Sequence, residues 1–362
     1  MAWDVVVVGG GVAGLVAARD LAATGRDVLL LEGSPQVGGK LRSAEVAGLT
    51  VDVGAEAMLA RRPEGVGLVA ELGAEVVHPT AATSGLWSRG ALRELPRSLM
   101  GVPFDLGRLA ASGVLSPEGL ARAAAETAAG PEILVGDDVS VGDLVASRLG
   151  DELVDRLVEP LLGGVYAGRA RRISAAAAVP QLLAMARRGS LLEQVAAVPT
   201  STSPVFASLP GGMGRLPCLV REGGGFEVRT SATVRALRRT TTGWALTVGP
   251  TTLPETIEAD AVVLATPAGP TSRLLGEEVA EAAAELAGIE AASVAVVTLA
   301  FRAQDVPEAL FERSGFLVPP VEQRTIKAST FSFAKWGWVR DLAADVVVLR
   351  TSLGRHGEEA TL

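Results

Sequence analysis

The stretch WDVVVVGGGVAG, residues 3–14, decides the fold of this chain of 362 residues. Its first half, Trp3–Val8, predicts a short strand that is apolar enough to be buried on both faces of a parallel sheet. Gly9, Gly11 and Gly14 follow in the G-x-G-x-x-G spacing, and the apolar pattern behind them predicts a helix. The first glycine allows a tight bend, the second lets a pyrophosphate approach the backbone, and the third lets helix and strand pack closely. The helix N-terminus would then bind the pyrophosphate of a dinucleotide.

The residues after this helix support a dinucleotide-binding fold. Gly25 is typical of a helix C-terminus. Residues 27–32 (DVLLLE) predict a second strand that ends in Glu32, where a carboxylate accepts hydrogen bonds from an adenosine ribose. The alternative is a glycine-rich turn in another α/β protein, with Glu32 as a solvated strand end. The strand–turn–helix context favours the dinucleotide.

The composition is that of a globular protein with a large core, since 48% of the residues are hydrophobic and 20% are charged. The length predicts two or three domains. A net charge of −8 without a basic block argues against a nucleic-acid partner. The apolar runs are shorter than the roughly 18 residues of a transmembrane helix. The early start of the first strand leaves no room for a signal peptide, and the lone Cys218 favours a reducing compartment. We therefore expect a soluble, cytoplasmic protein.

Few residues are available for catalysis by side chains. The chain has two histidines, His78 and His356, one tyrosine, Tyr166, and one cysteine. His78 precedes a proline at a predicted strand end, and His356 lies close to the last residue, so neither suits a Ser-His-Asp site or a His/Cys metal site. We expect no catalytic side chain and no metal, and a bound cofactor that performs the chemistry.

A second glycine turn follows the predicted acid. Residues 38–42 (GGKLR) place Lys40 and Arg42 beside two glycines, where they suit the same pyrophosphate. Residues 51–56 (VDVGAE) predict a short strand that runs into a turn with little side chain around Gly54, against which a flat ring could lie. The alternatives are a solvated basic loop and an ordinary β-turn.

These motifs together resemble the N-terminal FAD signature of the flavin amine oxidase superfamily, which includes amine oxidases, phytoene desaturases and protoporphyrinogen oxidases. The resemblance covers residues 4–58 and indicates FAD rather than NAD. It also implies that a valine of a later β-meander presents its backbone to the adenine. The residues implied to bind FAD are Gly9, Gly10, Gly11, Val12, Ala13, Gly14, Glu32, Gly33, Gly39, Lys40, Arg42, Gly54, Ala55, Glu56, Ala57 and Val234.

Two later stretches narrow the resemblance. Residues 159–168 (EPLLGGVYAG) are similar to a stretch of protoporphyrinogen and coproporphyrinogen oxidases that amine oxidases lack. Residues 326–336 (IKASTFSFAKW) resemble a stretch of bacterial porphyrinogen oxidases. Residues 208–214 (SLPGGMG) match a turn that precedes a helix in the superfamily. The chain therefore resembles bacterial FAD-dependent porphyrinogen oxidases.

Patterns elsewhere predict the remaining elements. Helices are expected over 63–72, after the capping residue Ser116, and behind the capping pair Ser140 and Asp143, whereas the glycines of 163–168 should interrupt a helix. The predicted strands are a hairpin turning at 89–90, a β-meander over 226–229, 232–238 and 244–248, a buried strand over 259–266, and late strands over 294–301, 315–319, 325–333 and 345–352.

The resemblance also implies a domain organisation. It predicts an α/β protein with a Rossmann-like FAD-binding domain, a discontinuous α+β substrate domain and a helical insertion. The FAD-binding domain would comprise 1–78 and 205–275, the substrate domain 79–106 and 276–352, and the helical domain 107–204. Because family members run on beyond this point, residues 353–362 are expected to be a truncated end.

The resemblance implies FAD-dependent oxidation of coproporphyrinogen III to coproporphyrin III, with O₂ as acceptor and hydrogen peroxide as product, in haem biosynthesis. A substrate with four propionates should be bound by cations, and the acidic chain without a membrane segment favours it over protoporphyrinogen. The candidate substrate residues, which are cations and the one tyrosine, are Arg89, Arg97, Tyr166, Arg169, Lys327 and Lys335.

Three alternatives stay open at this point. The chain could be a protoporphyrinogen IX oxidase, an amine oxidase or carotenoid desaturase-like flavoenzyme, or an inactive, truncated flavin-fold protein. The expected partners are the porphyrinogen and O₂, without nucleic acid, and a homodimer and peripheral membrane contact both stay open.

Overall fold

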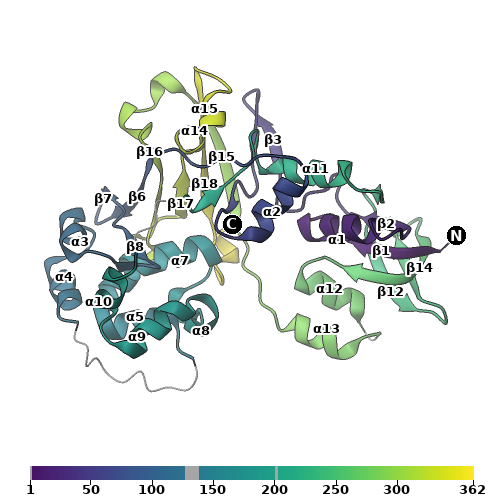
Figure 1. Cartoon of the computed structure of the whole chain (residues 1–362), viewed down its shortest axis with the longest axis horizontal. Helices are drawn as coiled ribbons and strands as arrows, with labels where there is room; N and C mark the ends of the chain where they lie inside the picture. The colour runs from purple at the N-terminus through teal and green to yellow at the C-terminus, as the bar shows by residue number, and fades with distance from the viewer. Residues whose placement is uncertain (1, 127–137, 200–202, 277) are drawn as a thin grey trace. The chain divides into compact units, whose positions relative to one another are not determined.

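The computed structural model describes residues 2–126, 138–199, 203–276 and 278–362. The chain forms two compact units. The first comprises Met1–His78 and Pro204–Glu290, and the second comprises Pro79–Ser203 and Ala291–Leu362. Residues 278–290 therefore belong to the first unit. Each unit is built around a sheet of its own (Figure 1).

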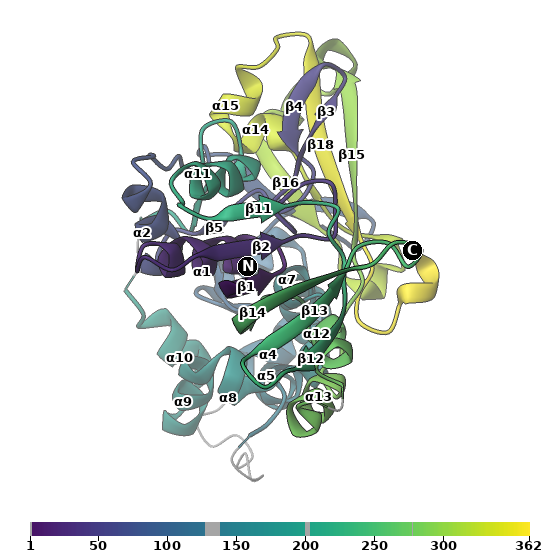
Figure 2. The same ribbon diagram turned by 90° about the vertical axis from the view of Figure 1, so that its right-hand side faces the viewer.

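The sheet of the first unit has the strand order β11-β2-β1-β14-β13-β12 (Figure 2). The strands β11, β2, β1 and β14 run parallel to their neighbours, and β14, β13 and β12 form an antiparallel meander. The bounds are β1 (Trp3–Val8), β2 (Val28–Leu31), β11 (Glu227–Arg229), β12 (Val234–Arg239), β13 (Trp244–Val248) and β14 (Glu255–Leu264).

One strand, β14, joins the parallel and antiparallel parts of this sheet. Its second half, up to Leu264, pairs in parallel with β1, so that Leu264 lies beside Val8. Its first half pairs antiparallel with β13. The strand is therefore longer than predicted, because it spans both parts.

The buried residues of β1 alternate between two cores, as the apolar run predicted. Val5 and Val7 face a core that includes Leu15 of α1 (Val12–Ala22) and Val220 of α11 (Leu216–Glu222). Val6 and Val8 face the other core, which holds the apolar side chains of β12 and β13. The other helices of this unit are α2 (Pro63–Glu71), which stops before Gly73 as predicted, α12 (Ala268–Leu275) and α13 (Ala280–Ala287). Its two small sheets are β3 (Ser43–Val46) with β4 (Leu49–Asp52), and β5 (Met58–Leu59) with β10 (Phe206–Ala207).

The sheet of the second unit has the order β15-β18-β17-β16-β6-β7. Its pairs are antiparallel except for β6 and β16. The hairpin of β6 and β7 turns at Arg89 and Gly90, which confirms the predicted turn. The bounds are β6 (Thr83–Ser88), β7 (Ala91–Glu94), β15 (Ala295–Arg302), β16 (Arg313–Leu317), β17 (Ile326–Thr330) and β18 (Val346–Leu353).

Helices beside this sheet enclose a large apolar core. The predicted caps are confirmed: the Gly119 N–H donates to Ser116 Oγ at 3.0 Å, and the Asp143 N–H donates to Ser140 Oγ at 3.0 Å. The helices are α3 (Leu106–Ser112), α4 (Pro117–Ala124), α5 (Val141–Leu149), α6 (Asp151–Leu153), a π-helical turn (Val154–Val158), α7 (Glu159–Tyr166), α8 (Ala175–Ala178), α9 (Pro180–Arg188) and α10 (Leu191–Ala196). Two further helices, α14 (Ser332–Lys335) and α15 (Gly337–Arg340), follow β17. A small two-stranded sheet is formed by β8 (Ser98–Leu99) and β9 (Val102–Pro103).

Two predicted elements are wrong. The glycines of 163–168 do not interrupt a helix at Gly163: α7, whose Leu162 is buried in the apolar core, continues through Gly163 and Gly164 and ends before Ala167, whose φ is +50°. The strand predicted over 325–333 ends at Thr330, and the chain turns into α14, which buries Phe333 among other aromatic rings.

The predicted β-meander is also wrong in its first strand. Residues 227–229 form β11, which pairs in parallel with β2 rather than with β12. The Ser231 N–H donates to Ser34 O, and the Ala232 N–H donates to Glu32 O, so that the chain crosses the end of β2 before β12 begins. Ser231 makes this crossing with a φ of +54°.

Candidate functional site

A cleft of about 1050 Å³ opens in the first unit, at the carboxyl ends of β1, β2 and β14. Ligands of open α/β sheets bind at this edge. The lining residues that the sequence predicted are Gly9, Gly11, Val12, Ala13, Glu32, Gly33, Gly39, Lys40 and Val234. The cleft therefore gathers residues from both glycine turns and from the meander.

The three glycines of the first turn have different neighbours. A Cβ on Gly14 would lie 1.9 Å from Gly9 O, and a Cβ on Gly9, whose φ is +108°, would lie 2.8 Å from Ala265 O. A Cβ on Gly11 would meet nothing within 4 Å, and its backbone is ordinary extended chain with φ −71°. Gly9 and Gly14 are thus required by the fold, whereas the space beside Gly11 belongs to the cleft.

The N-terminus of α1 is suited to an anion. No side chain caps this helix at Gly11, so its positive end is left to whatever enters the cleft. Among the described lining residues, Lys40, Arg235 and Arg273 are cationic, and Glu32 is the acidic one. This charge balance fits a pyrophosphate.

The carboxylate of Glu32 closes the first glycine turn. Its Oε2 accepts a hydrogen bond from the Gly10 N–H at 2.7 Å, and its Oε1 accepts one from the Ser34 N–H at 2.8 Å. Gly10 therefore contacts the acid behind the cleft and is not among the lining residues. Glu32 itself lines the cleft, where its remaining lone pairs can accept from a hydroxyl group.

The second glycine turn is held from behind by residues that do not line the cleft. Arg42 donates from Nε to Gly39 O at 3.3 Å and from Nη2 to Ser34 Oγ at 3.1 Å. The Ala55 N–H donates to Lys40 O at 2.8 Å, and a Cβ on Gly54 would lie 2.1 Å from that oxygen. Arg42, Gly54 and Ala55 thus lie behind or beside the turn, and Glu56 and Ala57 are also not among the lining residues of the cleft.

A segment that sequence reasoning missed completes the lining. Ala265, Thr266, Pro267, Pro270, Arg273 and Leu274, at the end of β14 and in α12, lie on the cleft. The signal was present, since a buried strand that stops at a Thr-Pro pair marks the carboxyl end of a strand next to β1. The sequence did not indicate that α12 would place Arg273 and Leu274 at the same edge of the sheet.

Asp52 is a buried acid that connects β4 to the Pro-Gly-Gly-Met turn. Its carboxylate accepts hydrogen bonds from the Met213 and Gly214 N–H groups at 2.7 and 2.9 Å, and from Ser43 Oγ at 3.0 Å. Burial raises the pKa of Asp52, although these three bonds act to lower it. Gly212, with a φ of +97°, leaves no room for a Cβ beside this carboxylate.

The candidate substrate residues lie in the second unit and in more than one place. Lys327 is buried on β17 near Arg355, another buried cation. Burial, reinforced by the charge of Arg355, lowers the pKa of Lys327. Arg169 forms ion pairs with Glu358 and Glu159.

Glu159 is a partly desolvated carboxyl at the same place. Its Oε2 accepts from the Ala170 N–H at 2.7 Å, and its Oε1 has no hydrogen-bond partner among the residues that the structure describes. Burial raises the pKa of Glu159, while the Ala170 N–H and the charge of Arg169 act to lower it. Tyr166 ends α7 and is exposed.

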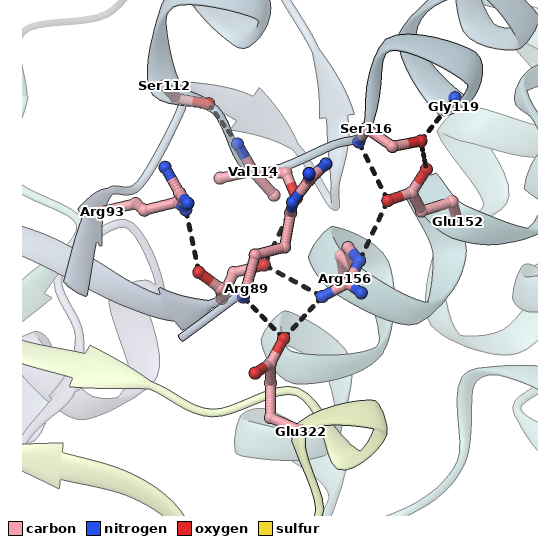
Figure 3. A network of polar contacts seen from close by, with 10 residues as sticks. Arg89, Arg93, Ser112, Val114, Ser116, Gly119, Glu152, Arg156 and Glu322 are labelled. Carbon is pink, nitrogen blue, oxygen red and sulfur yellow. Dashed lines mark hydrogen bonds and ion pairs between the residues drawn. The ribbon is translucent and has the colours of Figure 1, made fainter. Parts of the chain in front are cut away.

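The other candidates lie elsewhere in the unit. Arg97 is positioned over the ring of Phe104, and Lys335 over the ring of Trp336. Arg89 lies at the tip of the β6–β7 hairpin, where its N–H donates to Glu322 (Figure 3). Arg89 and Arg97 line two different small pockets.

No helix in the described part of the chain is both long and apolar enough to cross a membrane. Nor do the described residues include a group of three or more His, Cys, Asp or Glu that could hold a metal ion.

Comparison with protein families gives a match along nearly the whole chain. Residues 12–360 match the model of the flavin containing amine oxidoreductases. The chain belongs to this family. It is a flavin-dependent oxidoreductase by this membership, and its glycine-rich cleft lies in the Rossmann-like part of the fold, as predicted.

Individual relatives of the chain are named as porphyrinogen oxidases. The chain is 40% identical to the coproporphyrinogen III oxidase of Mycobacterium tuberculosis, over 98% of this chain and 77% of that protein. It is 27% identical to the coproporphyrinogen III oxidase of Bacillus subtilis, over 98% of this chain and 78% of that one. The protoporphyrinogen oxidase of Macaca fascicularis is 31% identical over 89% of this chain and 71% of its own length.

Solved structures agree with the fold. A protein of Exiguobacterium sp. 255-15 assigned as a protoporphyrinogen oxidase superposes with a TM-score of 0.83 and 29% identity, over 99% of this chain and 80% of that chain. UDP-galactopyranose mutase superposes with a TM-score of 0.72 at 15% identity, over 98% of this chain and 75% of that chain, which shows the shared fold alone.

The residues of the cleft fit a flavin cofactor. The open space at Gly11, the uncapped N-terminus of α1 and the surplus of cations suit a bridging phosphate group. When bound, a flavin supplies the capacity to accept a hydride, which the side chains of this chain do not have.

Proposed function

We propose that this flavin-dependent oxidoreductase uses FAD to oxidise coproporphyrinogen III to coproporphyrin III. The observation that carries the proposal is the 40% identity to a coproporphyrinogen III oxidase over 98% of the chain. The balanced reaction removes six hydrogen atoms from the tetrapyrrole, and three O₂ become three H₂O₂. No side chain needs to act as a nucleophile, which agrees with the scarcity of His, Cys and Tyr.

Within this proposal, the cleft of the first unit binds the dinucleotide. Gly11, Val12 and Ala13 at the start of α1 would face the pyrophosphate, with Lys40 as a nearby cation. Glu32 would accept from the ribose hydroxyls, and Val234 would lie against the adenine. Gly10, Gly14, Arg42 and residues 54–57 would act indirectly, by keeping the two glycine turns in position. Residues 1–78 and 205–275 would then form the FAD-binding domain.

The second unit would bind the tetrapyrrole. A buried cation is stabilised by an anion, so the neighbouring Lys327 and Arg355 favour a carboxylate of the substrate. Arg169 lies close to them through the shared partner Glu358, and Tyr166 ends the helix before it. Arg97 and Lys335 remain further candidates for binding the carboxylates of the substrate, whereas Arg89 lines a small pocket of its own.

The test is an assay of the FAD-saturated protein on coproporphyrinogen III and protoporphyrinogen IX in parallel, with porphyrin fluorescence and hydrogen peroxide as readouts. We expect a higher kcat/KM for coproporphyrinogen III and one peroxide per pair of electrons removed. A preference for protoporphyrinogen IX, the substrate named for the relative from Macaca fascicularis, would overturn the substrate while leaving the flavin assignment in place. Flavin binding without oxidation of either substrate would overturn the proposal.

A further inference from the structure

A small pocket of about 340 Å³ lies in the second unit and shares no lining residue with the cleft of the first unit. It is bounded by the tip of the β6–β7 hairpin, the end of α3 and the start of α4 (Figure 3). Two arginines and mostly small or apolar residues line it: Arg89, Arg93, Ala110, Gly113, Leu115, Ser116, Pro117 and Leu120. We refer to it as the Arg89–Arg93 pocket.

Arg93 is held in this pocket by the backbone. Its Nε donates to Ser88 O at 2.8 Å, which fixes the direction of the guanidinium. Its Nη1 lies against Gly113, where an added Cβ would be 2.5 Å from that nitrogen. Gly113 ends α3 with a φ of +64°, so a glycine both terminates the helix and leaves room for the guanidinium. Arg93 is therefore positioned rather than free in solvent.

Arg89 is held through its main chain. Its N–H donates to Glu322 Oε1 at 2.7 Å, and its φ is +54°, which is unfavourable for a residue with a side chain. The exposed side chain extends toward the 112–116 segment, as Figure 3 shows. Among the described residues, the Arg89 guanidinium has no ion pair or hydrogen-bond partner.

Glu152 and Glu322, two carboxylates beside the pocket, already have partners. Glu152 accepts from the Ser116 N–H and Oγ and from Arg156 Nε at 2.9, 2.6 and 3.0 Å. Glu322 accepts from Arg156 Nη1 at 2.5 Å in addition to the Arg89 N–H. Neither carboxylate lines the pocket. Two guanidinium groups thus share a pocket, and none of the described residues that line it carries a carboxylate.

We propose that the Arg89–Arg93 pocket binds a small oxyanion, the phosphate or carboxylate group of a compact molecule. Guanidinium groups bind both kinds of anion through two parallel N–H bonds. Leu115, Pro117 and Leu120 offer an apolar surface to the carbon part of such a molecule. The volume is at the lower end of the range for ligand pockets, roughly 300 to 1,000 Å³, which fits a small anion rather than a tetrapyrrole. The proposal does not depend on which porphyrinogen the protein oxidises.

The test measures anion binding by the FAD-saturated protein, so that the flavin cleft does not take up the probe. The probes are inorganic phosphate, pyrophosphate and citrate, each in isothermal titration calorimetry against potassium chloride of the same ionic strength. Arg89→Gln is the main variant, because the main-chain bond to Glu322 remains. Arg187→Gln is the matched control, since Arg187 is an exposed arginine of α9 in the same unit and outside the pocket.

We expect saturable binding of at least one probe, weakened by Arg89→Gln by roughly ten- to a hundred-fold, the range for a lost charge-assisted bond. Arg187→Gln should bind as the wild type does. Binding of the two phosphates alone identifies a phosphate ligand, and binding of citrate alone identifies a carboxylate ligand. Arg89→Lys keeps the positive charge but cannot form two parallel N–H bonds, so it should give an intermediate affinity. This variant replaces Arg89→Gln if Arg89→Gln does not fold. Binding no stronger than in potassium chloride, or equal binding by wild type and Arg89 variants, would overturn the proposal.

Discussion

At the scale of single residues, substitutions at Gly14 and Gly11 in the first glycine turn should have opposite effects on folding. Gly14→Ala places a Cβ 1.9 Å from Gly9 O, so this variant should fail to fold. Gly11→Val meets no protein atom at its Cβ, so it should fold with a free energy of unfolding within about 1 kcal/mol of the wild type. It should nevertheless bind FAD at least about tenfold more weakly, and more weakly than Glu32→Ala, because the side chain occupies the place of the pyrophosphate.

Urea unfolding and flavin absorbance after gel filtration check both expectations. Wild-type flavin occupancy in Gly11→Val would contradict the placement of the pyrophosphate, and a stable Gly14→Ala would contradict the close approach of α1 to β1.

Lys327 gives a second prediction at this scale, with a definite sign. Its pKa is lowered by burial, so the unfolded chain binds a proton more readily, and stability should rise with pH toward the ordinary lysine value of 10.5. Lys327→Met removes the buried charge at similar volume, and we expect it to be more stable at pH 7 by about 1 kcal/mol. The gain should shrink at pH 10. Urea unfolding at both pH values decides this, and a variant less stable at pH 7 would show that the ammonium group stabilises the fold.

At the scale of elements, Arg156 joins three parts of the second unit. Its guanidinium bridges Glu152 of α6 and Glu322, which follows β16, and also donates to Ser88 Oγ of β6 (Figure 3). Burial acts to raise the pKa of both carboxyls, but bonds from Ser116 to Glu152 and from the Arg89 N–H to Glu322, together with Arg156, lower them overall. The network therefore stabilises the fold above pH 4.5 and loses this effect as the pH falls through the lowered pKa values.

Arg156→Met should lower the free energy of unfolding by about 2 to 4 kcal/mol at pH 7, because two partly buried carboxylates lose their partner. The difference from the wild type should narrow at pH 3.5. Arg171→Met is the control, since Arg171 also bridges carboxylates, those of Asp143, Asp151 and Asp155, but on an exposed surface, where the loss should be less than about 1 kcal/mol. Equal losses in the two variants, measured by urea unfolding, would contradict the role given to Arg156.

The elements also show how far sequence reasoning reaches. Local signals sufficed where the determinant is local: the Ser116 and Ser140 caps, the turn at Gly90 and the glycine turn after β1 were all predicted. Local signals did not predict elements whose structure is decided by residues far away in the sequence. The parallel pairing of β11 depends on β2, and the turn from β17 into α14 places Phe333 against the distant ring of Phe311. The cleft residues from Ala265 to Leu274 were missed for the same reason, because their role depends on where α12 turns.

At the scale of the whole molecule, the two units have separate cores, and FAD is expected to bind only one of them. Scanning calorimetry should therefore show FAD raising the unfolding temperature of one transition. At a free concentration of 100 times Kd, the stabilisation should be about 2.7 kcal/mol. Gly11→Val is the control: with an affinity at least about tenfold lower, its stabilisation at the same concentration should fall to about 1.4 kcal/mol or less. A single transition, or an equal shift of both, would show that the units unfold together.

The double role of β14 has a consequence for synthesis. β1 leaves the ribosome early, but the strand that pairs with its other edge is completed only at Leu264. At about 5–20 residues per second, the Val-rich edge of β1 stays unpaired for on the order of ten to fifty seconds. During this time the helical core between Leu86 and Val195 can already form from contacts made within one stretch of chain. A nascent chain should thus acquire the core of its second unit before its N-terminal sheet, and depend on chaperones or rapid elongation to keep the open edge from pairing with other chains.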